Sequence, residues 1–327
     1  MKLLTMPQPG ALAAVDVPTP AAGPGEIRVR VACVGICGSD VEIFQGRREP
    51  KVRYSQPVLG HEVSGVVDQV GDHVAGIRVG DRVSCVEGWG ALAEYVVTSP
   101  ANALIFDDRL DLADGCLLEV LPGTAMAAWC TGIECNSDVL VVGQGLSGLI
   151  ITQLVAIGGC RRLVTVEPRG ENCALSAEFG AHDVRQSDIG TVAHALRTDY
   201  PCGFDVAVIA TRVNVIDAVV PLMRSRSRVV AYGGLDDHAQ VDIMALHRRS
   251  ISVLKEGGAI NGVRQARSLW REALQLAYDG VLNLRRLRTH DFPLDRADEA
   301  LMLRSGPPER GIHVVIHADG EGGETWP

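Results

Sequence analysis

Two sets of residues in this sequence have types and spacing suited to chemistry, and the first is a glycine-rich loop. Gly143-Gln144-Gly145-Leu146-Ser147-Gly148 follows the apolar run 139–142 and precedes the apolar stretch 149–157. Between a buried strand and a helix, Gly143 permits a tight turn, Gly145 lets a pyrophosphate approach the backbone, and Gly148 lets helix and strand pack closely. The helix N-terminus offers free N–H groups to phosphates. The loop, with Leu146 and Ser147 among its contacts, predicts a dinucleotide site.

The residues after the loop predict which dinucleotide is bound. Glu167 ends a second apolar strand, 162–166, where a carboxylate accepts hydrogen bonds from the adenosine ribose hydroxyls and repels a 2′-phosphate. Arg169 is the counter-argument, because an arginine there can receive that phosphate. We therefore expect NAD to be preferred over NADP. Ala210, directly after the strand 204–209, completes the expected cofactor contacts.

The second set comprises Cys37, His61 and Glu119. Taken singly, a cysteine is most often a small buried hydrophobe, and a histidine or glutamate is most often a solvated surface group. Taken together, they supply a thiolate, an imidazole and a carboxylate, which suit a zinc site with three protein ligands and one open position. They lie far apart in the sequence, so their spacing alone does not prove a site.

The elements that would position these residues fall into two classes. Short alternating apolar segments dominate residues 1–97 and return at 311–316, whereas strands and helices alternate from residue 139 onwards. Such alternation indicates an α/β domain with a doubly wound parallel sheet. The segment 110–130, which carries Glu119, reads as helical. We expect a β-rich domain formed by both termini, residues 1–122 and 263–327, and a dinucleotide-binding domain, residues 123–262, with the cofactor in the cleft between them.

The composition bounds the function. The chain has 327 residues and a net charge of −9, which argues against nucleic-acid or anionic-membrane partners. We find no signal peptide and no apolar stretch long enough to span a bilayer, so we expect a cytoplasmic protein. Nine cysteines without a C-x-x-C pair predict neither a disulfide framework nor a zinc ribbon.

Several motifs occur in a fixed order along nearly the whole chain. They are Gly35-Ile36-Cys37-Gly38-Ser39-Asp40, Gly60-His61-Glu62, Gly80-Asp81-Arg82-Val83, Ala93-Glu94-Tyr95 and the glycine-rich loop. In this order they resemble the zinc-dependent medium-chain alcohol/polyol dehydrogenase family, and the carboxylate at residue 119 resembles its sorbitol dehydrogenase-like branch. The resemblance implies a GroES-like catalytic domain joined to a Rossmann domain, and a hydride transferred between an alcohol and a nicotinamide cofactor.

The resemblance also assigns the metal ligands. Cys37 and His61 match the ligands of the family's catalytic zinc, and Glu119 matches a third, helix-borne ligand. Glu62 matches a position beside the metal that can ligate it or lie just behind it. Asp40 matches the acid that orients the histidine.

Two further assignments concern the proton. Ser39 matches the hydroxyl that takes the proton of the alcohol. Glu42, which replaces a relay histidine found in many members, or the cofactor ribose could pass the proton on.

One departure from the family is a deletion. The family usually carries a lobe with four closely spaced cysteines, of which only residues 84–92, with the single Cys85, remain here. We therefore expect one catalytic zinc and no structural zinc. Two alternatives stay open: a zinc-free quinone or enoyl reductase of the same superfamily, and a non-catalytic nucleotide-binding protein.

The substrate is the least constrained prediction. The segment 42–53 is rich in charge, and aromatic residues are 4% of the chain, although Phe44 and Trp89 could form one wall of a pocket. We expect a polar secondary alcohol such as a polyol, sugar or aminocyclitol. The apolar segment 250–254 reads as an edge strand that needs cover, so we expect a homodimer or homotetramer.

Overall fold

The structure is a computed structural model that describes residues 1–86, 88–233, 241–256, 264–306 and 311–318, and it divides into two compact units. Unit 1 comprises residues 1–120 and 284–327, and unit 2 comprises residues 121–283. The expected second boundary, at residue 263, is wrong. Helix α9 (Arg264–Tyr278) packs against α3 (Leu121–Cys130) and buries Trp270, so it belongs to unit 2.

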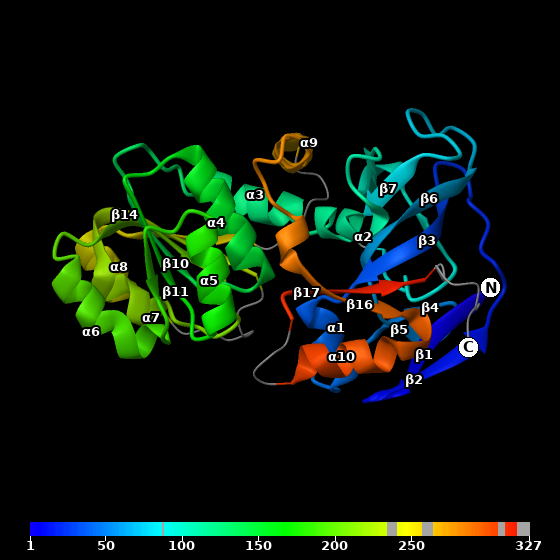
Figure 1. Ribbon diagram of the computed structural model, residues 1–327, viewed down its shortest axis with the longest axis horizontal. Helices are drawn as coiled ribbons and strands as arrows, with labels where there is room; N and C mark the ends of the chain where they lie inside the picture. The colour runs from blue at the N-terminus through cyan, green and yellow to red at the C-terminus, as the bar shows by residue number, and fades with distance from the viewer. Residues whose placement is uncertain (87, 234–240, 257–263, 307–310, 319–327) are drawn as a thin grey trace. The chain divides into compact units, whose positions relative to one another are not determined.

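Unit 1 is built from two sheets in the described residues (Figure 1). The smaller sheet has the strand order β2-β1-β5-β4: β1 (Lys2–Gln8), β2 (Ala11–Asp16), β4 (Lys51–Arg53) and β5 (Gln56–Val58). The larger has the order β16-β17-β3-β6-β7-β9, with β8 also paired to β3: β3 (Ile27–Gly35), β6 (Glu62–Val70), β7 (Arg82–Cys85), β8 (Tyr95–Thr98), β9 (Ala103–Phe106), β16 (Arg288–Pro293) and β17 (His313–His317). Both ends of the chain contribute strands, as expected.

Short helices connect the strands of unit 1. They are α1 (Gly38–Phe44), η1 (Pro100–Asn102), α2 (Leu112–Gly115), η2 (Cys116–Leu118), η4 (Arg285–Leu287), η5 (Leu294–Arg296) and α10 (Ala297–Ser305). The segment 110–130 is mostly helical, as expected, but it breaks at residues 119–120 into α2 and η2 on one side and α3 on the other. Pro122 has no N–H to continue the hydrogen-bond ladder and its ring clashes with the preceding turn, so the helix must restart.

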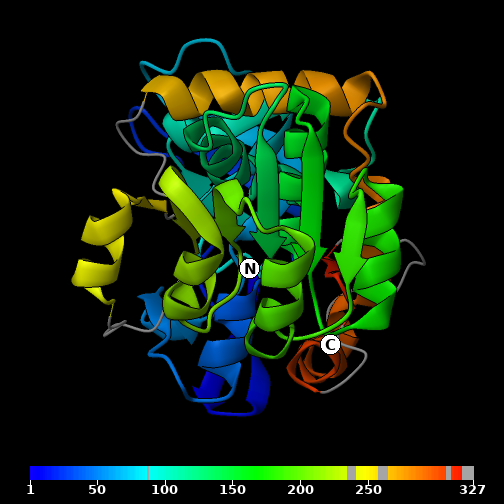
Figure 2. The same cartoon turned by 90° about the vertical axis from the view of Figure 1, so that its left-hand side faces the viewer.

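Unit 2 is a doubly wound α/β domain. Its described strands form one parallel sheet of order β12-β11-β10-β13-β14-β15: β10 (Asp138–Val142), β11 (Arg162–Val166), β12 (Asp183–Arg185), β13 (Phe204–Ile209), β14 (Met223–Tyr232) and β15 (Ser252–Glu256). Its other helices are α4 (Leu146–Gly158), α5 (Gly170–Glu178), α6 (Ile189–Asp199), α7 (Ile216–Val219), η3 (Val220–Leu222) and α8 (Ile243–Arg249). Figure 2 looks onto this unit.

The central strand β10 is apolar on both faces because both of its faces are covered. Val139 and Val141 of β10 join one hydrophobic cluster, and Leu140 and Val142 join another. This burial explains why the strand reads as a continuous apolar run rather than an alternating one. The fold class predicted from the sequence is confirmed.

Candidate metal and nucleotide sites

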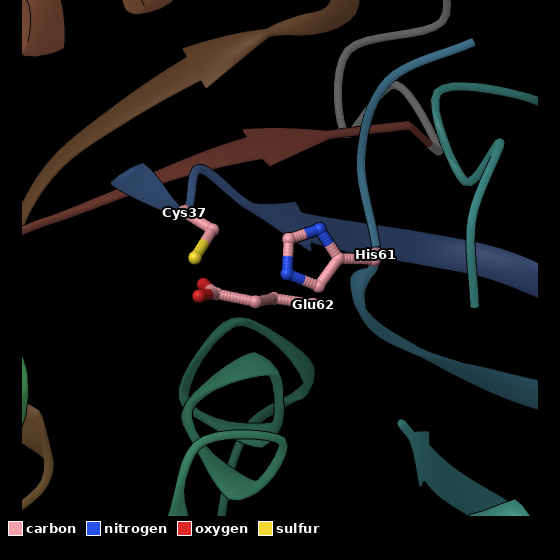
Figure 3. Close-up of side chains that lie close together, drawn as sticks. All are labelled: Cys37, His61 and Glu62. Carbon is pink, nitrogen blue, oxygen red and sulfur yellow. The ribbon is translucent and has the colours of Figure 1, made fainter. Parts of the chain in front are cut away.

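Strand pairing in unit 1 brings together Cys37, His61 and Glu62. Cys37 follows β3, and His61 and Glu62 stand at the start of β6, where Gly35 pairs with Glu62. One sulfur, one imidazole nitrogen and one carboxylate oxygen lie within 4.8 Å of one another and face the same point (Figure 3). Among the described residues this is the group suited to a metal ion.

Asp40 holds this group in place from behind. Its carboxylate accepts hydrogen bonds from the backbone N–H of Cys37 (3.0 Å) and of Gly60 (2.9 Å). It also lies 3.4 Å from His61 Nδ1, a close charge contact whose geometry falls short of a hydrogen bond. Burial would lower the pKa of His61, but Asp40 and Cys37 outweigh it and hold that pKa well above its usual value. The expectation that Asp40 orients the histidine is compatible with these contacts, because Nε2 is left for a ligand.

Glu119 does not belong to the group formed by Cys37, His61 and Glu62. It is half-buried and lies in the break between η2 and α3. Three of the four predicted metal ligands are thus adjacent, and a role for Glu119 stays a prediction.

Helix α1 carries the two residues predicted to handle the proton. Ser39 is buried, and its hydroxyl oxygen has no hydrogen-bond partner among the described residues. Buried hydroxyls nearly always form a hydrogen bond. An unpaired hydroxyl two residues from Cys37 therefore indicates that a bound molecule supplies the hydrogen-bond partner. Glu42 is half-buried on the same helix.

The donor set fits zinc. A thiolate, an imidazole and a carboxylate are its usual ligands, and three protein donors leave a position for a substrate. Ser39, two residues after Cys37, has a buried hydroxyl without a hydrogen-bond partner among the described residues. Cys37, His61 and Glu62 would hold the ion.

Two further residues contact the group. Trp89 stacks on His61 with ring centroids 4.3 Å apart, which fits its expected place in a pocket wall. His313, which sequence reasoning missed, is fully buried with its Nε2 3.0 Å from Glu62 Oε2. Burial would raise the pKa of Glu62, but the hydrogen bond and charge of His313, with His61, lower it. A histidine inside the otherwise apolar run 312–316 was the only sequence signal of this contact.

The glycine-rich loop of unit 2 has the expected geometry. Gly143 has φ +91°, and a Cβ there would lie 2.7 Å from the carbonyl oxygen of Ala210. A Cβ on Gly148 would lie 2.0 Å from the Gly143 carbonyl oxygen. At Gly145 a Cβ would meet only the Arg169 guanidinium, at 3.7 Å, so protein packing does not require this glycine. That freedom is what a ligand close to the backbone at the start of α4 would need.

Glu167 is at the end of β11, as predicted, but it is not free. One of its carboxylate oxygens accepts a hydrogen bond from the Gln144 N–H at 2.7 Å, and the other accepts one from Arg169 Nε at 2.7 Å. Its side chain is 3% exposed and that of Arg169 is 30% exposed. The two residues that argued for different cofactors therefore form one ion pair beside the loop.

No helix in the described part of the chain is long and apolar enough to cross a membrane.

Comparison with known proteins finds a matching domain and relatives that align over nearly the whole chain. Residues 23–108 match the alcohol dehydrogenase GroES-like domain. The chain is 28% identical to sorbitol dehydrogenase of Gallus gallus, over 95% of this chain and 94% of that protein. It is 27% identical to D-xylulose reductase of Morganella morganii, over 94% and 98%.

Solved structures have the same fold. Galactitol-1-phosphate dehydrogenase from Escherichia coli superposes with a TM-score of 0.81 at 20% identity, over 97% of this chain and 100% of that one. For 2R,3R-butanediol dehydrogenase from Bacillus subtilis the TM-score is 0.81 at 21% identity, over 97% and 99%. With the motifs and the Cys37–His61–Glu62 group, the matched GroES-like domain and the polyol dehydrogenase relatives support membership of the zinc-dependent medium-chain alcohol/polyol dehydrogenase family.

Proposed function

We propose that this protein is a zinc-dependent dehydrogenase that transfers a hydride between a polar secondary alcohol and NAD. The observation that carries the proposal is the Cys37–His61–Glu62 group with the unpartnered Ser39 hydroxyl beside it. The glycine-rich loop of unit 2 supplies a place for the dinucleotide. A zinc-free reductase of the same superfamily would not need Cys37, His61 and Glu62, which together form the metal group.

The proposed chemistry divides between the ion and the chain. Zinc, when bound, would lower the pKa of a nearby hydroxyl and so ease its deprotonation. Ser39 Oγ would accept the proton of the alcohol, and Glu42 or the cofactor ribose would pass it towards solvent. Asp40 would keep His61 oriented, because its carboxylate is fixed by the backbone of Cys37 and Gly60. The hydride would pass directly to the nicotinamide.

We propose Glu62 as the third protein ligand, because it is the carboxylate that lies with Cys37 and His61. Whether Glu119 also contacts the ion stays a prediction of the family resemblance. We also propose a single zinc per chain. Cys85, the cysteine of the shortened segment, is fully buried, and burial raises the pKa of its thiol to about 12, which disfavours the thiolate that a second zinc would need.

NAD remains the proposed cofactor, but we expect a smaller preference for NAD over NADP than Glu167 alone would give. The ion pair with Arg169 offsets part of the negative charge that would repel a 2′-phosphate. Comparing kcat/KM for NAD and NADP tests this preference, and a clear preference for NADP would contradict it.

For the substrate we propose a polyol, a sugar or an aminocyclitol. Relatives named sorbitol dehydrogenase and D-xylulose reductase support a polyhydroxy compound. Lys51 Nζ lies 5.9 Å from the Trp89 ring, so a charged group and an aromatic face stand together near His61. A panel of polyols, aminocyclitols, amino acids and simple alcohols, read as cofactor reduction, tests the class. A best activity on medium-chain primary alcohols, with polyols inert, would contradict it.

We further propose a homodimer or homotetramer assembled through β15. This strand is the edge of the parallel sheet in the described residues. Leu254 on it is 38% exposed, and Ile243 on neighbouring α8 is 71% exposed. Sedimentation at micromolar concentration tests this, and a monomer would contradict it.

The central test combines metal analysis with turnover. Protein purified with zinc present should hold one zinc per chain and should produce reduced cofactor in an alcohol-dependent reaction. Two zincs per chain would overturn the single-site proposal, and none would favour the zinc-free alternative. Alcohol-independent binding of the cofactor without turnover would favour a non-catalytic protein.

A further inference from the structure

His313 reaches the metal group from a distant part of the sequence through the sheet of unit 1. It begins β17, which pairs with β3, and β3 pairs with β6. Val315 lies opposite Gly35, and Gly35 lies opposite Glu62. His313 is two residues from Val315 and so projects from the same face of the sheet. Its imidazole can therefore cross β3 to reach Glu62.

Gly35 is what permits this crossing. A Cβ at that position would lie 2.4 Å from His313 Nε2 and 2.5 Å from Glu62 Oε2. Both distances are too short for non-bonded atoms, so any side chain there would separate the imidazole from the carboxylate. The missing side chain of the middle strand forms the space in which the two groups meet.

The direction of the hydrogen bond follows from its chemistry. An ionised carboxylate only accepts, so the Nε2–H of His313 donates to Glu62 Oε2. One carboxylate oxygen is fixed in this way and the other is left for the ion. The remaining imidazole nitrogen, Nδ1, is buried and has no hydrogen-bond partner among the described residues. A residue selected only for packing would not leave a buried polar atom unpaired, which favours a functional reason for the histidine.

We propose that His313 is a positioning residue for the metal site, acting through Glu62. The inference rests on the proposed function, because it concerns zinc held by Cys37, His61 and Glu62. Hydrogen bonds to a metal-binding carboxylate orient it, and their loss costs about 10–100-fold in metal affinity. His313 therefore determines how firmly the ion is held, without touching substrate or cofactor.

The experiment measures zinc release from the loaded protein to a chromogenic chelator in His313→Leu and His313→Gln. Leucine removes the donor, so zinc release should quicken by about 10-fold or more. Glutamine can place an amide N–H near the position of Nε2, so it should restore most of the wild-type retention. The matched control is His290→Gln, an exposed histidine on the neighbouring strand β16, which should release zinc at the wild-type rate. Cobalt substituted for zinc should show altered absorption bands in His313→Leu only.

A double-mutant comparison separates positioning from general structural support. In a Glu62→Gln background, His313→Leu should add little to zinc release, because the residue acts through that carboxylate. An equal effect in both backgrounds would overturn the inference, and so would unchanged release and cobalt spectra in the folded His313→Leu variant. If His313→Leu does not fold, His313→Asn replaces it, since its shorter amide cannot reach Glu62. A wild-type protein that holds no zinc would instead overturn the proposed function itself.

Discussion

The metal group of unit 1 and the nucleotide loop of unit 2 are assembled in opposite ways. The loop is a contiguous segment in which Gly148 packs against Gly143, five residues earlier. The metal group comes from the ends of two strands, and His313 joins it from the far end of the chain. A site formed by one contiguous segment can be predicted from its motif. A site assembled from several strands can be predicted only when the strand pairing is known.

The largest expected effect is that of Cys37→Ser, which should remove the activity of the metal site without changing NAD binding by the loop. Cys37→Ser replaces the thiolate ligand, and we expect kcat/KM to fall by about 10³-fold or more, because the ion supplies several kcal/mol of charge stabilisation. Unit 2 does not contain the ion, so the dissociation constant for NAD should stay near the wild-type value. Calorimetry for NAD binding and steady-state kinetics check the two halves. Loss of NAD affinity together with activity would mean that the sites do not work independently.

Roles could be predicted from the sequence for residues of the contiguous loop but less well for residues of the assembled metal site. The individual tasks predicted for Gly143, Gly145 and Gly148 fit the surroundings of these glycines in the structure. The family resemblance assigned both Glu119 and Glu62 to the metal, but only the structure shows that Glu62 is the carboxylate that lies with Cys37 and His61. His313 could not be found, because an isolated histidine in an apolar strand carries no signal of what faces it across the sheet.

The next effect tests the local character of the loop. In Gly148→Ala the new Cβ would overlap the Gly143 carbonyl, a backbone atom that cannot yield, so we expect unit 2 to lose about 3 kcal/mol of stability. Gly145→Ala is the matched control. Its Cβ meets only the Arg169 guanidinium, at 3.7 Å, so stability should hold while NAD binding weakens. Chemical denaturation and NAD titration distinguish the two, and equal destabilisation by both variants would contradict the roles assigned to the glycines.

A smaller effect sharpens the assignment of the assembled site. Glu62→Gln should lower zinc affinity by about 10–100-fold, and Glu119→Gln should lower it less, because Glu62 lies with Cys37 and His61 and Glu119 does not. Competition with a chelator of known affinity gives both values. If Glu119→Gln proved the more damaging, the helix-borne carboxylate favoured by the family resemblance would be the ligand, and Glu62 would lie behind it.

The smallest effect concerns cofactor choice, where two opposing sequence signals form a single ion pair. Arg169→Ala would leave the buried carboxylate of Glu167 without its positive partner and would remove the cation able to receive a 2′-phosphate. Both changes favour NAD. Because the Arg169 side chain is 30% exposed, the shift should be at most about 1 kcal/mol, or about fivefold in the ratio of kcat/KM for NAD to that for NADP.

The control for this change is Arg161→Ala. Arg161 pairs with Asp138 at the opposite end of β11 and should leave the ratio unchanged. A shift towards NADP in Arg169→Ala would show that Arg169 had been masking the phosphate site rather than offsetting the charge of Glu167. Such a result would mean that the ion pair blocks the 2′-phosphate site sterically. The prediction from the local motif would then have failed for the same reason that His313 could not be predicted: the role of a side chain depends on the partner that it contacts in the fold.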